Sequence, residues 1–209
     1  EHQLAYLRYQ INPHFYMNTL NNIHALVDIN PERAKTNIVE LSKMLRYVLY
    51  DANRESVSLK KEIEFLRHYF RLMSLRFTDD IKTSLTVPER MTDCNVPPLL
   101  LIIFAENAFK HGISYSGQSF VEVSIDVVDG NVVFTCSNSK HTAKPTYEKG
   151  GVGLVNVRKR LDLLYDTNYK LEIKDSEQRF DVKLVMPVLK ERPQDKTVNN
   201  GSDKNGKQG

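Results

Sequence analysis

The sequence is poor in the residues and patterns that mark several protein classes. It has no tryptophan and only two cysteines, Cys94 and Cys136, which lie in no metal-ligand spacing and in no short secreted scaffold. This usage excludes a disulfide framework and predicts a reducing, cytosolic compartment. No apolar run approaches the roughly 18 residues of a membrane span, and no signal-peptide pattern is present. We therefore expect a soluble piece.

A charge excess of one sign is also missing. The chain has 29 Lys and Arg against 26 Asp and Glu, a formal net charge of +3 at a mass of 24.1 kDa. It contains no basic block and no basic stretch interleaved with aromatic residues. We therefore exclude nucleic acid as a partner.

The length of 209 residues exceeds what one small core needs and predicts two modest domains followed by a tail. We place a helical region at 1–78, a second domain at 79–189 and a disordered tail at 190–209, where polar residues, Pro and Gly dominate. Because a helical pattern is already under way at Glu1, we expect a fragment whose upstream part is missing.

Apolar residues recur at helical spacing through the first 78 residues. The three stripes are Tyr16, Leu20, Ile23 and Val27, then Ala34, Ile38, Leu41, Leu45 and Val48, then Leu59, Ile63, Leu66, Phe70, Met73 and Phe77. The third has the spacing of a coiled-coil seam. Burying its large side chains stabilises by about 1.5–3 kcal/mol each as an upper estimate, so we expect two copies of the chain to bury it in a four-helix bundle. Pro13 must kink the first helix or begin a new one.

After residue 80 the pattern becomes mixed. Alternation over 81–87 predicts a strand, Pro97-Pro98 predicts the start of an apolar helix that runs to Lys110, and Asp129-Gly130 predicts the turn of a β-hairpin. The remaining expected elements are a helix near 154–164 and strands near 169–173 and 180–186. The fold class is therefore α+β, a helical region followed by an α/β sandwich.

A histidine among asparagines is the first candidate site. Asn18 follows His14 by one helical turn, so both side chains project from one face. A neutral imidazole is a competent nucleophile towards a γ-phosphoryl group, and Asn18 could orient that group or, later, a hydrolytic water. The alternative is helix capping around Pro13. Capping explains one or two asparagines better than the four at positions 12, 18, 21 and 22.

A second cluster, Glu106 to Gly112, ends the apolar helix. Asn107 could ligate Mg²⁺, Lys110 could meet phosphate oxygens, and Glu106 could serve as a base or as an outer-shell partner of the metal. The alternative is a helix terminus that Gly112 caps, with cations complementing the helix dipole. These two interpretations are evenly balanced on the cluster alone.

The glycine cluster Gly150-Gly151-Val152-Gly153-Leu154 decides between them. It follows a polar loop and directly precedes a helix, so its backbone amides and the helix N-terminus form an anion site. A phosphate acceptor, a phosphate and metal site, and an anion loop then stand in order along the chain.

These three motifs resemble those of the LytS-type sensor histidine kinases, over about residues 7 to 187. In that family a dimerisation and phosphoacceptor region precedes a GHKL-type, or Bergerat, ATP-binding domain. The resemblance implies that His14 is phosphorylated, that Asn107 binds Mg²⁺ and that residues 151–158 help close a lid over ATP. The implied ATP-binding residues are Asn107, Lys110, His111, Asn138, Gly150, Gly151, Gly153 and Leu154.

The resemblance also implies partners and a location. It implies a homodimer through the helical region, ATP and Mg²⁺ as cofactors, and transfer of the phosphoryl group from His14 to an aspartate in the receiver domain of a response regulator. It further implies the cytoplasmic portion of an inner-membrane protein, with a membrane or sensor segment upstream.

The chain departs from the family at three places, one of which is the absence of the family's later Gly-Thr, with Arg179-Phe180 nearby instead. Tyr16-Met17 stands where many relatives have Leu-Phe, and Ser137-Asn138-Ser139 stands where the superfamily carries Asp-x-Gly-x-Gly, whose Asp reads adenine. Either Asn138 or Ser137 then replaces that carboxylate, which predicts weaker ATP affinity and poorer discrimination against GTP. Two rival functions remain: a pseudokinase signalling scaffold that binds nucleotide poorly, and an ATPase clamp of the same superfamily, against which the His14 motif argues.

Overall fold

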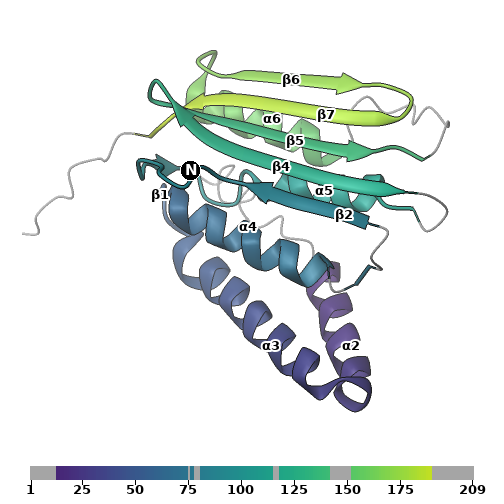
Figure 1. The fold of residues 1–209 in the computed structure, drawn as a ribbon. Helices are drawn as coiled ribbons and strands as arrows, with labels where there is room; N and C mark the ends of the chain where they lie inside the picture. Colours follow the sequence, from purple (N-terminus) through teal and green to yellow (C-terminus); the bar gives the residue numbers. More distant parts are fainter. Residues whose placement is uncertain (1–12, 75, 78–80, 115–117, 142–151, 190–209) are drawn as a thin grey trace, which may run out of the picture.

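The computed structural model describes residues 13–74, 76–77, 81–114, 118–141 and 152–189 (Figure 1). The helical elements are α2 (Pro13–Ile29), α3 (Pro31–Arg46), the π-helical turn η1 (Tyr47–Asp51), α4 (Leu59–Ser74), α5 (Ile102–Gly112) and α6 (Val152–Tyr165). The strands are β1 (Val57–Ser58), β2 (Ile81–Thr86), β3 (Asn95–Val96), β4 (Ser119–Val128), β5 (Asn131–Ser139), β6 (Lys170–Asp175) and β7 (Arg179–Pro187). The predicted α+β class is confirmed.

Helices α2 and α3 form an antiparallel hairpin that projects away from the sheet (Figure 1). Pro13 begins α2, where the missing N–H of proline costs nothing. Asn30 caps α3 by accepting a hydrogen bond from the Arg33 amide at 3.0 Å, and Pro31 occupies the first turn. Helix α3 then passes into the wider turn η1.

Five strands form one sheet in the order β2-β4-β5-β7-β6. Strand β2 pairs with β4 in parallel, and the other neighbours are antiparallel. The predicted hairpin is confirmed: Val128 pairs with Asn131 across Asp129-Gly130, whose φ angles of 49° and 73° are those of a tight hairpin turn. Helices α5 and α6 lie on one face of this sheet (Figure 1), where Phe104 of α5 meets Phe134 of β5.

Helix α4 corrects the expectation that its apolar seam joins two copies of the chain. Leu59 and Leu66 are 0% exposed within a single chain. Buried residues also lie between the seam positions, at Phe65, Tyr69 and Leu72, so the helix buries more than one face. It packs against α3, α5 and β2 of the same chain. The inference failed because a seam spacing identifies a buried stripe without identifying what buries it.

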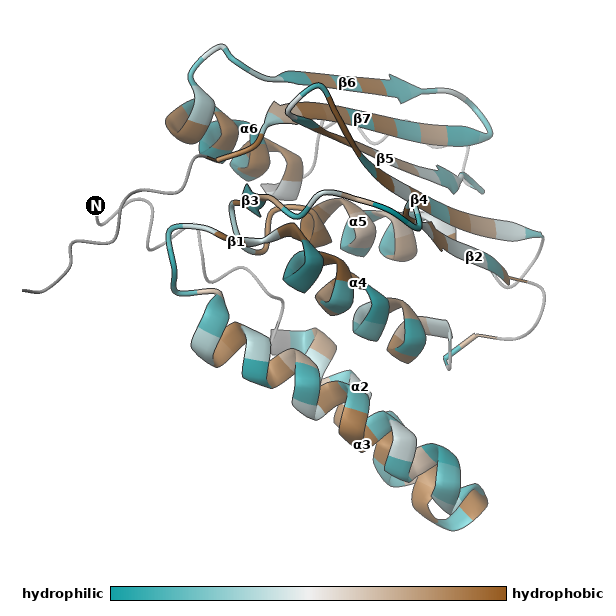
Figure 2. Ribbon diagram, turned by 60° about the vertical axis from the view of Figure 1, so that its left-hand side comes forward, coloured by the Kyte–Doolittle hydropathy of each residue, from teal (hydrophilic) through white to brown (hydrophobic). Residues whose placement is uncertain are grey.

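The exposed apolar residues lie instead on the hairpin. Met17, Leu20 and Val27 of α2, and Ile38, Val39 and Leu45 of α3, are all exposed. Figure 2 shows apolar positions recurring along both helices. The domain division at residue 78 stays a prediction, although α4, on its N-terminal side, contacts both α3 and α5. No helix of the described ranges is long and apolar enough to cross a membrane.

The helix expected from Pro97-Pro98 begins later, at Ile102. Leu99 takes a positive φ of 55°, which a helix cannot contain. Its amide donates to Glu62 Oε1 at 2.7 Å, while the Arg160 guanidinium donates to the carbonyls of Pro98 and Leu99 at 2.5 and 3.4 Å. These buried contacts hold the segment in a turn. The short pair β1 and β3, which the sequence did not predict, adjoins it. The tail at 190–209 lies outside the described residues.

Candidate functional site

His14 lies in the first turn of α2 and is exposed. Asn18 lies one turn on, with its Nδ2 3.0 Å from His14 Nδ1. The structure therefore brings the two predicted residues together. An amide can turn either its N–H or its oxygen to this ring nitrogen, so Asn18 can select the tautomer of the imidazole.

Three aromatic side chains in contact pack the start of α2 against α4 and, through it, against α5. Phe15 packs against Tyr69 of α4 with ring centroids 5.1 Å apart, and Tyr69 meets Phe109 of α5 edge-on at 5.6 Å. All three rings are buried. This packing connects the start of α2, which carries His14, through Tyr69 of α4 to α5, the helix that carries the Glu106 cluster.

Glu106 is the one acid among the predicted site residues, and its pKa is strongly shifted. Burial raises its pKa from 4.5 to about 7, and its Oε1 is buried without a hydrogen-bond partner. The hydroxyl of Tyr16 is likewise buried without a partner. Burial and, to a lesser degree, the Glu106 charge raise the pKa of Tyr16 to about 12. The same charge acts on Tyr69, whose pKa is raised chiefly by burial.

Asn107 faces the start of α6. A Cβ placed on Gly153 would lie 3.5 Å from Asn107 Nδ2 and 3.7 Å from its Oδ1. These are ordinary van der Waals distances, so the α6 backbone lies next to the Asn107 amide, and the second and third sequence motifs meet at this point. Leu154 is buried beside it, whereas Gly150 and Gly151 lie outside the described residues, as does most of the lid that the sequence predicted.

Two cations end α5. Lys110 and His111 are exposed in its last turn. Desolvation and, secondly, the charge of Lys110 lower the pKa of His111, which favours the neutral imidazole. No group of three or more His, Cys, Asp or Glu suited to a metal occurs in the parts of the chain that the structure describes. The Asn107 amide oxygen suits Mg²⁺, an ion that takes few protein ligands and draws most of its shell from phosphates and water.

Asn138 packs against the end of α5. A Cβ on Gly112 would meet Asn138 Cβ at 2.6 Å, so only glycine allows this contact. Asn138 is buried, and its Nδ2 donates to the Ser139 carbonyl at 2.8 Å. It shares a strand face with Cys136, which contacts the Phe104 carbonyl of α5.

Ser137 belongs to the opposite face of β5. Its hydroxyl donates to Asp181 of β7 at 2.5 Å, and Ser137 and Asp181 are paired in register. That hydrogen bond and the Arg179 guanidinium hold the Asp181 pKa below its usual range, against the effect of burial. Of the two residues that the sequence left as replacements for the acidic residue, Asn138 is therefore the one that faces the α5 layer.

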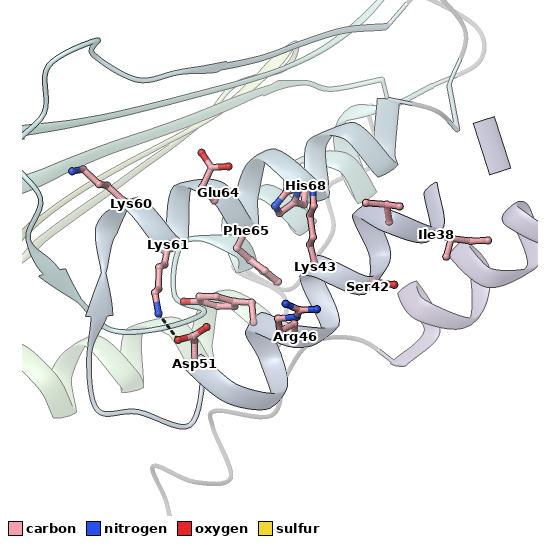
Figure 3. Close-up of a pocket in the computed structure, with 12 residues that line it drawn as sticks. Ile38, Ser42, Lys43, Arg46, Asp51, Lys60, Lys61, Glu64, Phe65 and His68 are labelled. Atoms are coloured by element: carbon pink, nitrogen blue, oxygen red, sulfur yellow. Dashed lines mark hydrogen bonds and ion pairs between the residues drawn. The ribbon is translucent and has the colours of Figure 1, made fainter. Parts of the chain in front are cut away.

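A groove of about 540 Å³ lies elsewhere, between α3 and α4 (Figure 3). Its lining includes the cations Lys43, Arg46, Lys60 and Lys61. Lys61 pairs with Asp51 at 2.6 Å, as the dashed line in Figure 3 shows. None of the residues predicted to act on phosphate lines this groove.

Sequence reasoning missed Tyr16, Glu62 and Arg160. Tyr16 was noted only as an apolar replacement, although a hydroxyl two residues after His14 is a polar group near the predicted acceptor. Glu62 and Arg160 read as solvent-facing charges of amphipathic helices. No sequence signal separates such charges from buried ones, because their burial depends on segments 37 and 61 residues away that close over them.

Comparisons with known proteins show the family of the chain. A family model described as histidine kinase matches residues 2–81. Sensor protein LytS of Oceanobacillus iheyensis is 31% identical over 202 residues, covering 90% of this chain and 34% of its own. Sensor histidine kinase YpdA of Escherichia coli is 32% identical over 173 residues, covering 78% of this chain and 30% of its own. The chain thus spans about a third of the length of these curated relatives. Among solved structures, the catalytic domain of histidine kinase ThkA aligns with a TM-score of 0.49 at 14% identity, over 64% of this chain and 96% of that one.

Proposed function

Because this chain belongs to the sensor histidine kinase family, we propose that it is a kinase core that transfers the γ-phosphoryl group of ATP to His14. The observation that carries the proposal is the packing of Phe15 on Tyr69 and, through it, on Phe109 of α5. This packing supports the proposal because it connects the start of α2, which carries His14, through α4 to the helix that carries Asn107.

His14 is the proposed phosphoacceptor, and Asn18 is the residue that orients it. Attack by Nε2 needs a lone pair on that nitrogen, so the proton must reside on Nδ1. In the structure Asn18 Nδ2 faces Nδ1 at 3.0 Å. Rotating the amide by half a turn would present its oxygen to Nδ1 and support this tautomer. The imidazole then attacks in line with the leaving oxygen.

The proposed nucleotide site lies where α5 and α6 meet. Asn107 is the proposed ligand of Mg²⁺, which when bound shields the charge of the phosphates. Lys110 pairs with phosphate oxygens, and the start of α6 at Gly153, next to Asn107, supplies backbone amides for them. Glu106, adjacent to Asn107, acts as a base or as an outer-shell partner of the metal.

Asn138 is the proposed reader of adenine. Its N–H₂ is committed to the Ser139 carbonyl, so its oxygen is the atom left to accept from the adenine amino group. A neutral acceptor is weaker than a carboxylate, so we expect Asn138→Asp to tighten ATP binding by about tenfold, or about 1.4 kcal/mol. Ser137→Asp is the matched control, since it would place a carboxylate beside Asp181. Calorimetry in which Ser137→Asp tightens binding and Asn138→Asp does not would reverse the assignment.

A homodimer through the hairpin completes the proposal. Leu20 and Val27 of α2 are 49% and 48% exposed, and Ile38 and Leu45 of α3 are 49% and 39% exposed. Each pair is spaced by seven residues and lies on one helix face. Replacing Leu20 and Leu45 with Glu should give a folded monomer by sedimentation, and an unchanged dimer would exclude this face.

The phosphoryl group then passes from His14 to an aspartate of a response regulator. The test incubates the chain with γ-labelled ATP and examines the label for acid lability and base stability, the signature of phosphohistidine. We expect His14→Gln to abolish the label while ATP binding persists, because an amide preserves size without a nucleophilic nitrogen. Label at the wild-type level in that variant would refute His14 as the acceptor. Absence of label from the wild type would favour the scaffold, and ATP hydrolysis without label would favour the clamp.

A further inference from the structure

Arg160 of α6 is a buried cation to which the proposed kinase mechanism gives no part. The residue is 4% exposed, a rare degree of burial for arginine. Its guanidinium donates to the Pro98 carbonyl at 2.5 Å and to the Leu99 carbonyl at 3.4 Å. Burying a charge costs free energy, and hydrogen bonds of this kind offset part of that cost. Arg160 is therefore attached to the turn that leads into α5.

The turn at residues 98–99 has an unusual backbone. Leu99 takes a positive φ of 55°, a conformation that costs a bulky residue free energy and persists only where the surroundings hold it. The Leu99 amide donates to Glu62 of α4 at 2.7 Å, and the Leu99 carbonyl accepts from Arg160 of α6. The segment that leads into α5 is therefore held from two helices at once.

Two contacts set how α6 lies on α5. In the first turn of α6, a Cβ on Gly153 would lie 3.5 Å from Asn107 Nδ2 and 3.7 Å from Ile103 Cγ2. Arg160 follows Gly153 by two helical turns, so both project from one face of α6, and Arg160 reaches the carbonyls that precede α5. Helix α6 therefore runs opposite to α5. The proposed nucleotide site lies at one end of their shared surface and Arg160 at the other.

We propose that Arg160 is a positioning residue for the nucleotide site, which holds α6 in the register on α5 that keeps Gly153 next to Asn107. The inference rests on the proposed kinase function, because it concerns the site that would bind Mg-ATP. A guanidinium suits this role, since its planar fork donates to two carbonyls at once, whereas a lysine ammonium is a point charge on a flexible stem. Arg160 lies two turns from Gly153 and so acts through α6, not on the nucleotide.

Loss of the guanidinium should weaken nucleotide binding more than it slows the bound chain. Without it, the empty chain holds the correct register only part of the time, and the apparent dissociation constant rises as that fraction falls. We expect calorimetry to give a dissociation constant for Mg-ATP that is about tenfold higher in Arg160→Met and about threefold higher in Arg160→Lys, which can keep one hydrogen bond.

The rate of phosphohistidine formation supplies the second half of this test. Bound nucleotide favours the register in which it binds, so it shifts the chain back towards the wild-type arrangement. At saturating Mg-ATP the rate in Arg160→Met should therefore lie within about twofold of the wild-type rate. A weaker affinity with a preserved rate is the pattern that positioning of the empty site predicts.

Two control variants separate register from overall stability. Tyr47→Phe removes a hydrogen bond to Glu62 from the side of η1, so it weakens the same buried cluster without touching α6. Lys159→Met removes the exposed cation that directly precedes Arg160. Both variants should bind Mg-ATP with the wild-type dissociation constant, and Tyr47→Phe should do so although its free energy of unfolding is lower.

Nuclear magnetic resonance can observe the register directly. The Ile103 γ2 methyl lies against the Cβ position of Gly153, so a nuclear Overhauser effect should join this methyl to the Gly153 α-protons in the empty wild-type chain. We expect the signal to weaken in empty Arg160→Met and to return when Mg²⁺ and a non-hydrolysable ATP analogue are bound. The signal should keep its wild-type intensity in Tyr47→Phe.

The outcomes distinguish this inference from the kinase assignment. If the wild type binds Mg-ATP and folded Arg160→Met binds it equally tightly, or keeps the Ile103–Gly153 signal, Arg160 has no such role and the kinase function stands. An equal loss of affinity in Tyr47→Phe would mean that affinity follows stability, which also overturns the role. Should Arg160→Met not fold, an unchanged affinity in Arg160→Lys overturns it. A wild type that binds no Mg-ATP would remove the nucleotide site and this inference together.

Discussion

The helical hairpin meets the α/β layer at two junctions that are built in opposite ways. At the α3 end, Tyr47 of η1 and the Leu99 amide both donate to Oε1 of Glu62, which is 0% exposed, and Arg160 closes the cluster from α6. As at the α2 end, one carboxyl oxygen, here Oε2, has no hydrogen-bond partner. At the α2 end, Tyr16 and Glu106 form the same pair of residue types, and the hydroxyl and one carboxyl oxygen have no partner.

The electrostatics follow this difference. Burial raises the pKa of both glutamates, and at Glu62 the Tyr47 hydroxyl, the Leu99 amide and the Arg160 charge oppose that rise. Glu106 has no opposing group of this kind, and its pKa reaches about 7. Hydrogen bonds to a buried carboxyl favour one arrangement of the groups that make them. The α3 junction has two such bonds, to Glu62 Oε1, whereas at the α2 junction the Tyr16 hydroxyl and Glu106 Oε1 have none.

We expect the largest effect from a substitution that breaks the α3 junction. Arg160→Met leaves Glu62 without its buried cation and the carbonyls of Pro98 and Leu99 without their donor. Losing two hydrogen bonds from a charged donor to buried carbonyls costs about 3–6 kcal/mol in all, at about 1.5–3 kcal/mol for each. We expect the free energy of unfolding, measured by urea denaturation, to fall by that amount.

Arg67→Met is the matched control on the exposed face of α4. Arg67 pairs with Glu64 at 2.7 Å, where both side chains are about half exposed. Such a pair contributes at most about 1 kcal/mol. Equal losses in the two variants would show that the Arg160 contacts stabilise no more than a surface pair does.

The Glu106 carboxyl at the α2 junction should make the stability of the chain depend on pH. The folded chain holds a proton on Glu106 up to pH of about 7, and the unfolded chain loses it near 4.5. The folded state therefore binds more protons within this window, and its stability falls as pH rises from 4.5 to 7. Glu106→Gln removes this slope. At pH 8 the variant should be more stable than the wild type by up to about 3 kcal/mol.

The measurement compares urea unfolding at pH 5 and pH 8 for Glu106→Gln and for Glu64→Gln, which changes an exposed carboxyl on α4. The gain at pH 8 should occur only at position 106. Parallel slopes in the wild type and Glu106→Gln would mean that the carboxyl is not held in an apolar environment.

The sequence predicted the parts of this comparison that depend on local pattern. The hairpin at Asp129-Gly130 followed from alternation around a turn dipeptide, and the adjacency of His14 and Asn18 followed from the helical period. The start of α5 was placed too early, because the turn at Leu99 depends on Glu62 and Arg160, which are distant in sequence. The seam of α4 was read as an interface between copies because periodicity does not report which surface covers a stripe. The opposed junctions were out of reach for the same reason, since a tyrosine and a glutamate look alike in both.

The smallest expected effect gives the sharpest comparison, because it makes one substitution at both junctions. Tyr47→Phe removes a donor from a buried carboxylate, and a hydrogen bond to a charged group contributes about 1.5–3 kcal/mol, so the free energy of unfolding should fall by about 2 kcal/mol. Tyr16→Phe removes a hydroxyl that has no partner in this arrangement, so the change should stay within about 0.5 kcal/mol and can be stabilising. The rings stay in place in both variants, so packing around Phe65 and Phe15 is preserved. Urea unfolding at pH 7 measures both. A loss at position 16 as large as that at position 47 would mean that the Tyr16 hydroxyl is already bonded in the resting chain, and that the α2 junction is as fixed as the α3 junction.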